Sequence, residues 1–249
     1  MAITIRALRL YSISYFLAGR SCSVCPEAGI CVGTDRNVSI GMCCRYYYED
    51  FERELRELMR AEAVVELPGF VREQTVNRDI SPSQSAVSIH AACSGDDYSP
   101  GVLGVSGMQW GFTNPYKKGL IINARSETAR EKNLFADSMA NRRCVIPASG
   151  FYEWDRYKAR YRFTLPENEL ILLAGFFREE QGVNRYTILT TEANDSMIRV
   201  HERMPVMIGR DEIRPWIYDP SRLSEFLERK QPELICEQDS GQMRMDFGL

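Results

Sequence analysis

Short apolar segments separated by turn-forming residues make up the chain beyond Pro68, and their spacing limits the fold more than any other feature. Each segment is about as long as a strand and too short for a core helix. Residues 160–165 (Arg-Tyr-Arg-Phe-Thr-Leu) also alternate polar and apolar side chains, which is typical of a half-buried strand. The predicted strands cover residues 86–91, 102–110, 120–123, 143–146, 151–155, 159–165, 170–177 and 186–191.

Three other segments carry a helical pattern. In residues 49–62 the apolar side chains recur every three or four positions, which places them on one face of a helix. Residues 128–141 begin with the Thr-x-x-Glu spacing of a capping box, and residues 220–230 again concentrate apolar side chains on one face. Strands and helices together predict an α+β domain that is rich in strands and has two or three peripheral helices.

Composition excludes several classes of protein. The 249 residues include 31 Lys and Arg and 34 Asp and Glu, so the net charge of −3 excludes a uniformly basic nucleic-acid coat. A hydrophobic content of 44% is too high for a disordered chain, and no run of about 18 apolar residues could span a membrane. With His90 and His201 as its two histidines, the chain cannot support a mechanism that needs several imidazoles. We expect a monomer without a membrane partner.

The first 41 residues do not resemble the rest of the chain. They show no helical or strand period, and they make a poor signal peptide because Arg9 interrupts the apolar stretch. The eight cysteines are concentrated at this end, which argues against a secreted disulfide scaffold and favours the cytoplasm. A Cys-x2-Cys-x5-Cys pattern from Cys22 lacks a fourth zinc ligand, so we expect no metal and no cofactor. Residues 1–41 are predicted to be unstructured or to precede the true start, and residues 42–249 to form one domain.

Basic residues are concentrated in the middle of the chain. Between Lys117 and Arg162, 11 Lys and Arg stand against five Asp and Glu. The simpler interpretation is a solvated face of the protein. The alternative is a groove that follows the phosphates of a nucleic acid.

Four polar clusters interrupt the apolar segments, at residues 42–45, 122–128, 147–154 and 200–205. They contain a thiol, an amide, a carboxylate and an imidazole, which could converge as a nucleophile, an orienting group and a general acid/base pair. Each residue taken alone could equally be structural. The four candidates are Cys43, Asn123, Glu153 and His201.

In this order, the clusters resemble the motifs of the SRAP family (SOS response-associated peptidases, or abasic-site processing proteins). The resemblance covers residues 42 to about 240, and several ordered motifs together make it specific. It implies a strand-rich domain around an open, β-barrel-like core. The matching segments are Met42-Cys43-Cys44-Arg45, Ile80-Ser81-Pro82-Ser83-Gln84, Trp110-Gly111, Asn123-Ala124-Arg125-Ser126-Glu127-Thr128, Arg143-Cys144 through Glu153-Trp154, Thr190-Thr191-Glu192-Ala193-Asn194 and His201-Glu202-Arg203-Met204-Pro205.

The resemblance implies a DNA-repair protein that senses abasic sites in single-stranded DNA and forms a covalent cross-link through an N-terminal cysteine. The opened abasic sugar is an aldehyde, with which an α-amine forms a Schiff base before the neighbouring thiol closes a thiazolidine. Cys43 would be the nucleophile, Asn123 would hold the sugar, and Glu153 and His201 would move protons. Peptidase activity that exposes the cysteine, and lyase-type Schiff-base chemistry, are also implied.

The resemblance also implies which residues contact DNA. Arg45 and Arg125 would bind flanking phosphates, for which the guanidinium group is well suited. Pro82 and Trp110 would wedge or stack between bases, with Trp154 close by. Trp110 and Trp154 are equally good candidates for core aromatics. Two further side chains in apolar segments are expected to be structural: His90 and Cys144.

Two features depart from the family pattern. Cys44 stands where the family has Gly, so a second thiol lies beside the nucleophile and could compete with it or form a disulfide. Cys43 is internal here, so it has a free amine only if translation starts at Met42 or the preceding segment is cleaved. Two alternatives therefore stay open: a noncovalent sensor of damaged single-stranded DNA, and an amidohydrolase or peptidase with an N-terminal cysteine.

Overall fold

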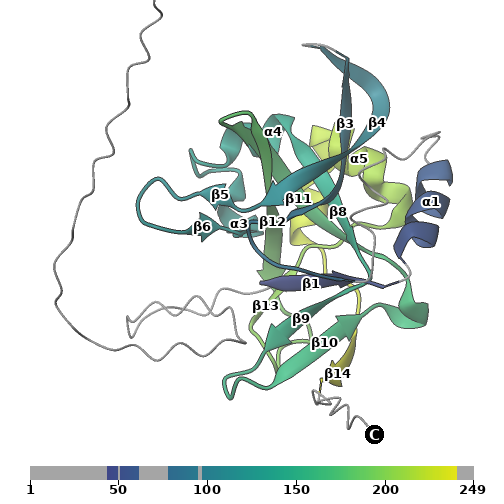
Figure 1. The fold of residues 1–249 in the computed structure, drawn as a ribbon, viewed down its shortest axis with the longest axis vertical. Helices are drawn as coiled ribbons and strands as arrows, with labels where there is room; N and C mark the ends of the chain where they lie inside the picture. Colours follow the sequence, from purple (N-terminus) through teal and green to yellow (C-terminus); the bar gives the residue numbers. More distant parts are fainter. Residues whose placement is uncertain (1–43, 50, 62–77, 95–96, 240–249) are drawn as a thin grey trace, which may run out of the picture. The chain divides into compact units, whose positions relative to one another are not determined.

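The computed structural model describes residues 44–49, 51–61, 78–94 and 97–239. These residues form two sheets, a short two-stranded ribbon and several short helices (Figure 1). The strand-rich α+β class predicted from the sequence is therefore confirmed. The sequence did not predict the strands β1 (Arg45–Tyr48), β2 (Arg78–Ile80), β5 (Phe112–Thr113), β13 (Arg203–Pro205) and β14 (Ile235–Gln238).

The first sheet has five antiparallel strands in the order β14-β10-β9-β1-β2. Tyr46 of β1 lies opposite Ile80 on one side and opposite Phe151 on the other. All three side chains are buried, so they mark the inner face of this sheet. The strands are β1 (Arg45–Tyr48), β2 (Arg78–Ile80), β9 (Gly150–Trp154), β10 (Arg160–Thr164) and β14 (Ile235–Gln238).

The second sheet follows the order β11-β8-β3-β4-β12-β13, with β7 paired to β12. Because β11 also pairs with β12, the strands from β11 to β12 close a ring, although not a full barrel. The open, barrel-like core that was predicted is thus confirmed. The strands are β3 (Ser85–Ser94), β4 (Asp97–Trp110), β7 (Asn123–Arg125), β8 (Arg143–Ala148), β11 (Ile171–Glu180), β12 (Val183–Glu192) and β13 (Arg203–Pro205), and the ribbon is β5 (Phe112–Thr113) and β6 (Leu120–Ile121).

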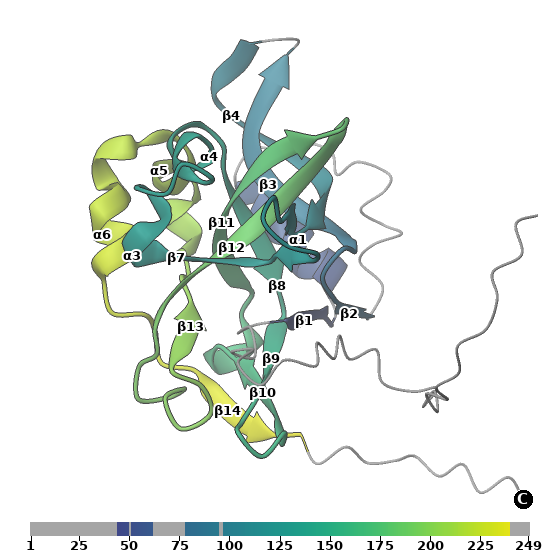
Figure 2. The ribbon, with the colours of Figure 1, turned by 90° about the vertical axis from the view of Figure 1, so that its left-hand side faces the viewer.

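The helices are short and peripheral, and α3 to α6 gather on one side of the second sheet (Figure 2). The predicted helix over 128–141 is wrong as a single element, because the chain unwinds between α3 and α4 and lets Phe135 pack against Phe112 and Phe176. The helices are α1 (Phe51–Ala61), α3 (Ser126–Ala129), α4 (Ala136–Asn141), α5 (Ile213–Tyr218) and α6 (Leu223–Glu228). Within the described ranges, no helix has the length and apolar character needed to cross a membrane.

A buried arginine fastens two of these helices to the second sheet. Arg143 of β8 is 4% exposed, and its guanidinium donates to the carbonyl oxygens of Met139 (3.0 Å) and Ala140 (2.7 Å) near the end of α4. It also donates to the carbonyl oxygens of Trp216 (2.5 Å) and Ile217 (2.9 Å) in α5. The last carbonyl groups of a helix have no partner within the helix, so one cation satisfies two helix ends at once.

Candidate active site

The start of β1 meets a buried carboxylate on β9. Arg45 lies opposite Tyr152, so the same antiparallel register places Cys44 opposite Glu153. Glu153 is 0% exposed, and its Oε1 accepts a hydrogen bond from the backbone N–H of Trp154 at 3.2 Å. Partial burial, reinforced by the charge of Glu153, raises the pKa of the Cys44 thiol, and Arg45 offsets part of this rise. Cys43 itself lies outside the described residues.

A second junction joins the segments that follow Asn123 and His201. β7 and β13 lie on the two sides of β12, which pairs through Thr190 with both of them. Arg203 of β13 reaches across, donating from both terminal nitrogens to Glu127 at 2.5 and 2.9 Å and from one of them to the Thr190 carbonyl at 2.6 Å. These hydrogen bonds hold the pKa of Glu127 below its usual value. Two of the four predicted clusters are thus in direct contact.

The imidazole of His201 has a defined orientation. Its Nδ1 accepts a hydrogen bond from the backbone N–H of Arg203 at 3.0 Å. A nitrogen that accepts carries no proton, so the neutral ring holds its proton on Nε2. The ring is half-buried. His201 can therefore donate a proton from Nε2 while the backbone holds its other side.

Trp110 supports the strand that carries Asn123. The indole Nε1 of Trp110 donates to the carbonyl oxygen of Ile122 at 2.9 Å, one residue before Asn123. Trp110 is 0% exposed and its ring lies parallel to that of Tyr186, with centroids 6.3 Å apart. A side chain enclosed in this way has no surface on which a base could stack. The structure therefore places Trp110 in the core, where it positions its neighbours.

An aromatic cluster connects the two junctions. The hydroxyl groups of Tyr46 in β1 and Tyr186 in β12 lie 2.6 Å apart, and the Tyr46 ring also contacts Trp110 at 5.2 Å between centroids. Burial raises the pKa of Tyr46 well above its usual value, so this hydroxyl stays protonated. In Figures 1 and 2, β13 lies at the same level as β1 and β9, toward the end where the first sheet lies. The cluster therefore links β1 of the first sheet to β4 and β12 of the second.

The other predicted DNA-binding residues keep some exposure. Arg45 pairs with Asp79 at 3.3 Å, and about a third of its side chain (34%) is exposed, whereas Arg125 at the end of β7 is an exposed residue. Pro82 is half-buried in the turn before β3. Trp154 is also half-buried, but strand alternation turns it to the face of β9 opposite Glu153.

One exposed aromatic residue was not among the predicted contacts. Tyr116 is 87% exposed in the connection between β5 and β6, and the next two residues, Lys117 and Lys118, are exposed lysines. Its backbone N–H donates to Asn114 Oδ1 at 2.9 Å, and the Thr113 hydroxyl donates to Glu180 at 2.6 Å, so the loop is anchored at its base. An aromatic ring beside two cations suits a single-stranded nucleic acid. The aromatic residue followed by two lysines within residues 114–119 could have indicated this contact from the sequence alone.

Among the described residues, no group of three or more His, Cys, Asp or Glu side chains is arranged to hold a metal ion. The spaced cysteines Cys22, Cys25 and Cys31 lie outside those residues. Cys144 is buried in β8, and His90 is hydrogen-bonded through both ring nitrogens within the β3–β4 pair, so neither reaches the two junctions described above.

Comparison with known proteins agrees with the family resemblance of the sequence motifs. The model of the family SOS response associated peptidase (SRAP) matches residues 42–242. Abasic site processing protein YoaM of Bacillus subtilis is 33% identical over 164 residues, which are 60% of this chain and 69% of that protein. Abasic site processing protein HMCES of Xenopus tropicalis is 30% identical over 152 residues, 45% of this chain and 44% of that protein.

Solved structures share the fold. A phage-related protein from Bordetella bronchiseptica superimposes with a TM-score of 0.62 at 20% identity, covering 79% of this chain and 93% of that one. A second protein from the same organism gives a TM-score of 0.59 at 22% identity, covering 79% of this chain and 99% of that one. At these identities the likeness concerns the fold alone.

Proposed function

The chain belongs to the SRAP family of abasic-site processing proteins, and on that premise we propose that it forms a covalent cross-link with abasic sites in single-stranded DNA through Cys43. The proposal requires Cys43 to be the first residue of the active protein. This follows if translation starts at Met42 and that Met is removed, or if the chain is cleaved before Cys43. Residues 1–41 would then take no part in the reaction.

The proposed reaction uses both functional groups of an N-terminal cysteine. The α-amine of Cys43 adds to the C1′ aldehyde of the opened sugar, and loss of one water gives a Schiff base. The thiol of the same residue then adds across the C=N bond, its sulfur to carbon and its proton to nitrogen. The product is a five-membered thiazolidine ring, and the net change is the loss of one water.

The observation that carries this proposal is the buried carboxylate of Glu153 beside the start of β1. Solvent screens a fully buried carboxylate very little, so its charge acts strongly on the groups next to it. The charge of Glu153 acts on the thiol of Cys44, the residue that follows Cys43 in the sequence. Its carboxylate would accept the proton that the ammonium group must lose before it attacks.

The remaining roles follow from the second junction. His201, with its proton on Nε2, would protonate the oxygen that leaves as water and assist the reverse reaction. Asn123 would hold the opened sugar, while Arg203 and Glu127 keep the two segments together. Arg45, Arg125 and Tyr116 would bind the strand around the lesion.

Two further activities belong to this proposal. Hydrolysis of the peptide bond before Cys43, with water adding across it, would expose the amine in a chain that is translated from Met1. The Schiff base also makes the C2′ hydrogens acidic, and loss of one of them as a proton would form a C2′–C3′ double bond and expel the 3′ phosphate, which is a lyase reaction. Closure of the thiazolidine removes the C=N bond and would therefore suppress this cleavage.

Intact mass spectrometry tests the proposal directly. The protein is expressed from the full sequence, purified and weighed before and after incubation with a single strand that carries one abasic site. We expect a free protein that begins at Cys43 and an adduct heavier by the DNA less one water. A strand with a tetrahydrofuran abasic analogue, which has no aldehyde, should give no adduct.

The variant Cys43→Ser separates the two steps of the reaction, because serine keeps the amine and loses the thiol. It should form a Schiff base that borohydride can trap but no stable adduct without it. A protein that retains residues 1–42 and binds abasic DNA without any adduct would contradict the covalent mechanism. The noncovalent sensor would then be the function. Hydrolysis of small amides without any DNA affinity would instead identify the amidohydrolase.

A further inference from the structure

His201 lies in the connection between β12 and β13, which folds into two tight turns. The N–H of Ile198 donates to the carbonyl of Asn194 at 2.9 Å, and the N–H of His201 donates to the carbonyl of Met197 at 3.0 Å. The N–H of Ala193 donates to the carbonyl of Glu202 at 3.0 Å and closes the base of the connection. The position of His201 therefore depends on how this base is held.

The side chain of Asn194 binds the base to a segment near the C-terminus. Its Oδ1 accepts hydrogen bonds from the N–H and hydroxyl of Ser196 at 3.1 and 2.6 Å, which fixes the first turn. Its Nδ2 donates to the carbonyl oxygens of Gln231 and Pro232 at 3.0 and 2.9 Å. The hydroxyl of Ser196 also accepts from the N–H of Leu234 at 3.1 Å. Residues before His201 are thus bound to residues 231–234.

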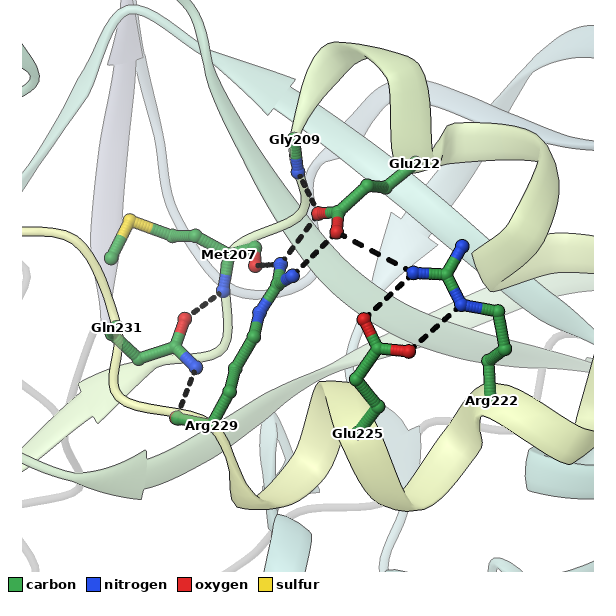
Figure 3. A network of polar contacts seen from close by, with 7 residues as sticks. All are labelled: Met207, Gly209, Glu212, Arg222, Glu225, Arg229 and Gln231. Carbon is green, nitrogen blue, oxygen red and sulfur yellow. Dashed lines mark hydrogen bonds and ion pairs between the residues drawn. The ribbon is translucent and has the colours of Figure 1, made fainter.

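Residues after His201 are bound to the same segment. The buried side chain of Gln231 accepts from the N–H of Met207 through Oε1 at 2.7 Å, and Arg229 donates to the carbonyl of Met207 at 2.8 Å (Figure 3). Arg229 is held in turn by the two carboxylate oxygens of Glu212 at 2.6 and 2.7 Å and lies over the ring of Phe226. Both flanks of His201 therefore converge on residues 229–234.

We propose that residues 229–234 act as a clamp that positions His201 for proton transfer, with Asn194 and Gln231 as positioning residues. The inference rests on the proposed function for the role of His201. The hydrogen bonds of the clamp do not depend on that role, because they hold the connection between β12 and β13 in the free protein. A displacement of about 1 Å in a group that transfers a proton can lower a rate by roughly 100-fold. A clamp that prevents it would therefore contribute to the rate without touching DNA.

The two histidines of this chain allow a direct spectroscopic test. His201 Nδ1 accepts a hydrogen bond, so its proton lies on Nε2. The Nδ1 of His90 lies 2.7 Å from the carbonyl oxygen of Ala91, and its Nε2 lies 2.9 Å from the hydroxyl oxygen of Ser106. A carbonyl only accepts, so His90 carries its proton on Nδ1. The two neutral rings are therefore opposite tautomers, which ¹⁵N correlation spectra of the full chain distinguish.

Asn194→Asp and Gln231→Ala are the test variants. Aspartate keeps the acceptor for Ser196 and loses the donor to the clamp. At about pH 8.5, above the usual histidine titration, we expect both variants to show mixed or broadened tautomers for His201, with the His90 signals as an unchanged internal reference. At saturating abasic DNA, the rate of cross-linking should fall roughly 10- to 100-fold. Affinity for the DNA should stay within about twofold, because no contact with the strand is removed.

Arg222→Gln is the matched control. It removes the ion pair with Glu225 and a longer one, 3.9 Å, with Glu212, and it leaves the hydrogen bonds of Arg229 and Gln231 to Met207 in place (Figure 3). It should change neither the His201 spectrum nor the rate. If both test variants keep one His201 tautomer and the full rate while their thermal midpoints fall, the clamp is merely structural and the inference is wrong. If wild-type protein forms no cross-link, the proposed function fails, and the histidine spectra still decide whether the clamp holds His201.

Discussion

Arg203 donates from both of its terminal nitrogens to the carboxylate of Glu127, at 2.5 and 2.9 Å. The pair joins two segments that lie far apart in the sequence, since Arg203 follows His201 closely and Glu127 follows Asn123. The side chain of Arg203 is 13% exposed and that of Glu127 is 44% exposed, so solvent screens this pair in part and its contribution to stability is modest. The pair is therefore expected to stabilise the fold as well as the site.

Glu127→Gln should lower the free energy of unfolding by about 1 kcal/mol at pH 7, because the neutral amide keeps one hydrogen bond and loses the ionic attraction. Arg203 lowers the pKa of Glu127 in the folded state. The stabilisation is therefore complete above the unfolded pKa of about 4.3 and disappears as the pH falls through the lower folded value. Urea unfolding between pH 3 and pH 7 measures this difference.

The control for that experiment is Glu131→Gln, which changes an exposed carboxylate outside the ion pair. It should leave the free energy of unfolding within about 0.5 kcal/mol of the wild-type value at every pH. A Glu127→Gln effect that stays constant down to pH 3 would show that packing, not ionisation, is responsible.

Cys44 should react with iodoacetamide more slowly than an ordinary thiol at pH 7. Burial and the charge of Glu153 raise its pKa, so less of the reactive thiolate is present. Glu153→Gln removes the charge and keeps the shape, and should raise the alkylation rate of Cys44 by up to about tenfold, the change in thiolate for one pKa unit. Peptide mapping by mass spectrometry over pH 6–10 follows the reaction. Labelling of exposed Cys236 in the same samples should not change, and an unaltered Cys44 rate would contradict the contact with Glu153.

Local patterns predicted much of the fold. The periodicity of residues 49–62 and 220–230 corresponds to α1 and α6, and the alternation of 160–165 corresponds to β10. The prediction failed where tertiary contacts override the pattern. A continuous helix over 128–141 would take Phe135 away from Phe112 and Phe176. The six residues of α5 were missed because they contain a proline, and their helix end depends on Arg143, which is distant in the sequence.

The sequence predicted the motifs of the candidate site, but it could not predict the contacts between them. The local sequence does not indicate that β1 pairs with β9 or that Arg203 donates to Glu127, because such contacts depend on the topology of the whole fold. Trp110 was predicted equally well as a base-stacking residue or as a core residue, and its full burial favours the core. The roles of Asn123 and His201 in catalysis stay predictions.

Arg143 should be one of the most sensitive positions for stability. Arg143→Met leaves the carbonyl groups of two helix ends without their donor in a buried setting, which should lower the free energy of unfolding by about 3 kcal/mol. Arg143→Lys keeps the charge, but one ammonium group cannot reach both helices. The free energy of unfolding should therefore fall by an intermediate amount in this variant. Equilibrium urea unfolding gives both values. Arg142→Met, in the neighbouring partly exposed position, should cost less than about 1 kcal/mol, and an equal loss at both positions would refute the capping role.

Substitutions at Tyr116 and Trp110 should affect different properties, the affinity for DNA at Tyr116 and the stability of the fold at Trp110. Tyr116→Ala removes an exposed ring, so the thermal midpoint should not change while affinity for abasic single-stranded DNA falls about 5- to 100-fold, the range for one stacked base. Trp110→Phe removes the hydrogen bond to the Ile122 carbonyl and should lower the free energy of unfolding by about 1–3 kcal/mol. Fluorescence anisotropy and thermal unfolding measure the two properties. Tyr157→Ala is the matched control, because Tyr157 is also exposed (74%) and stands beside cationic side chains but lies in the turn between β9 and β10. Equal losses of affinity at Tyr116 and Tyr157 would show general electrostatic attraction rather than a stacking contact at the β5–β6 loop.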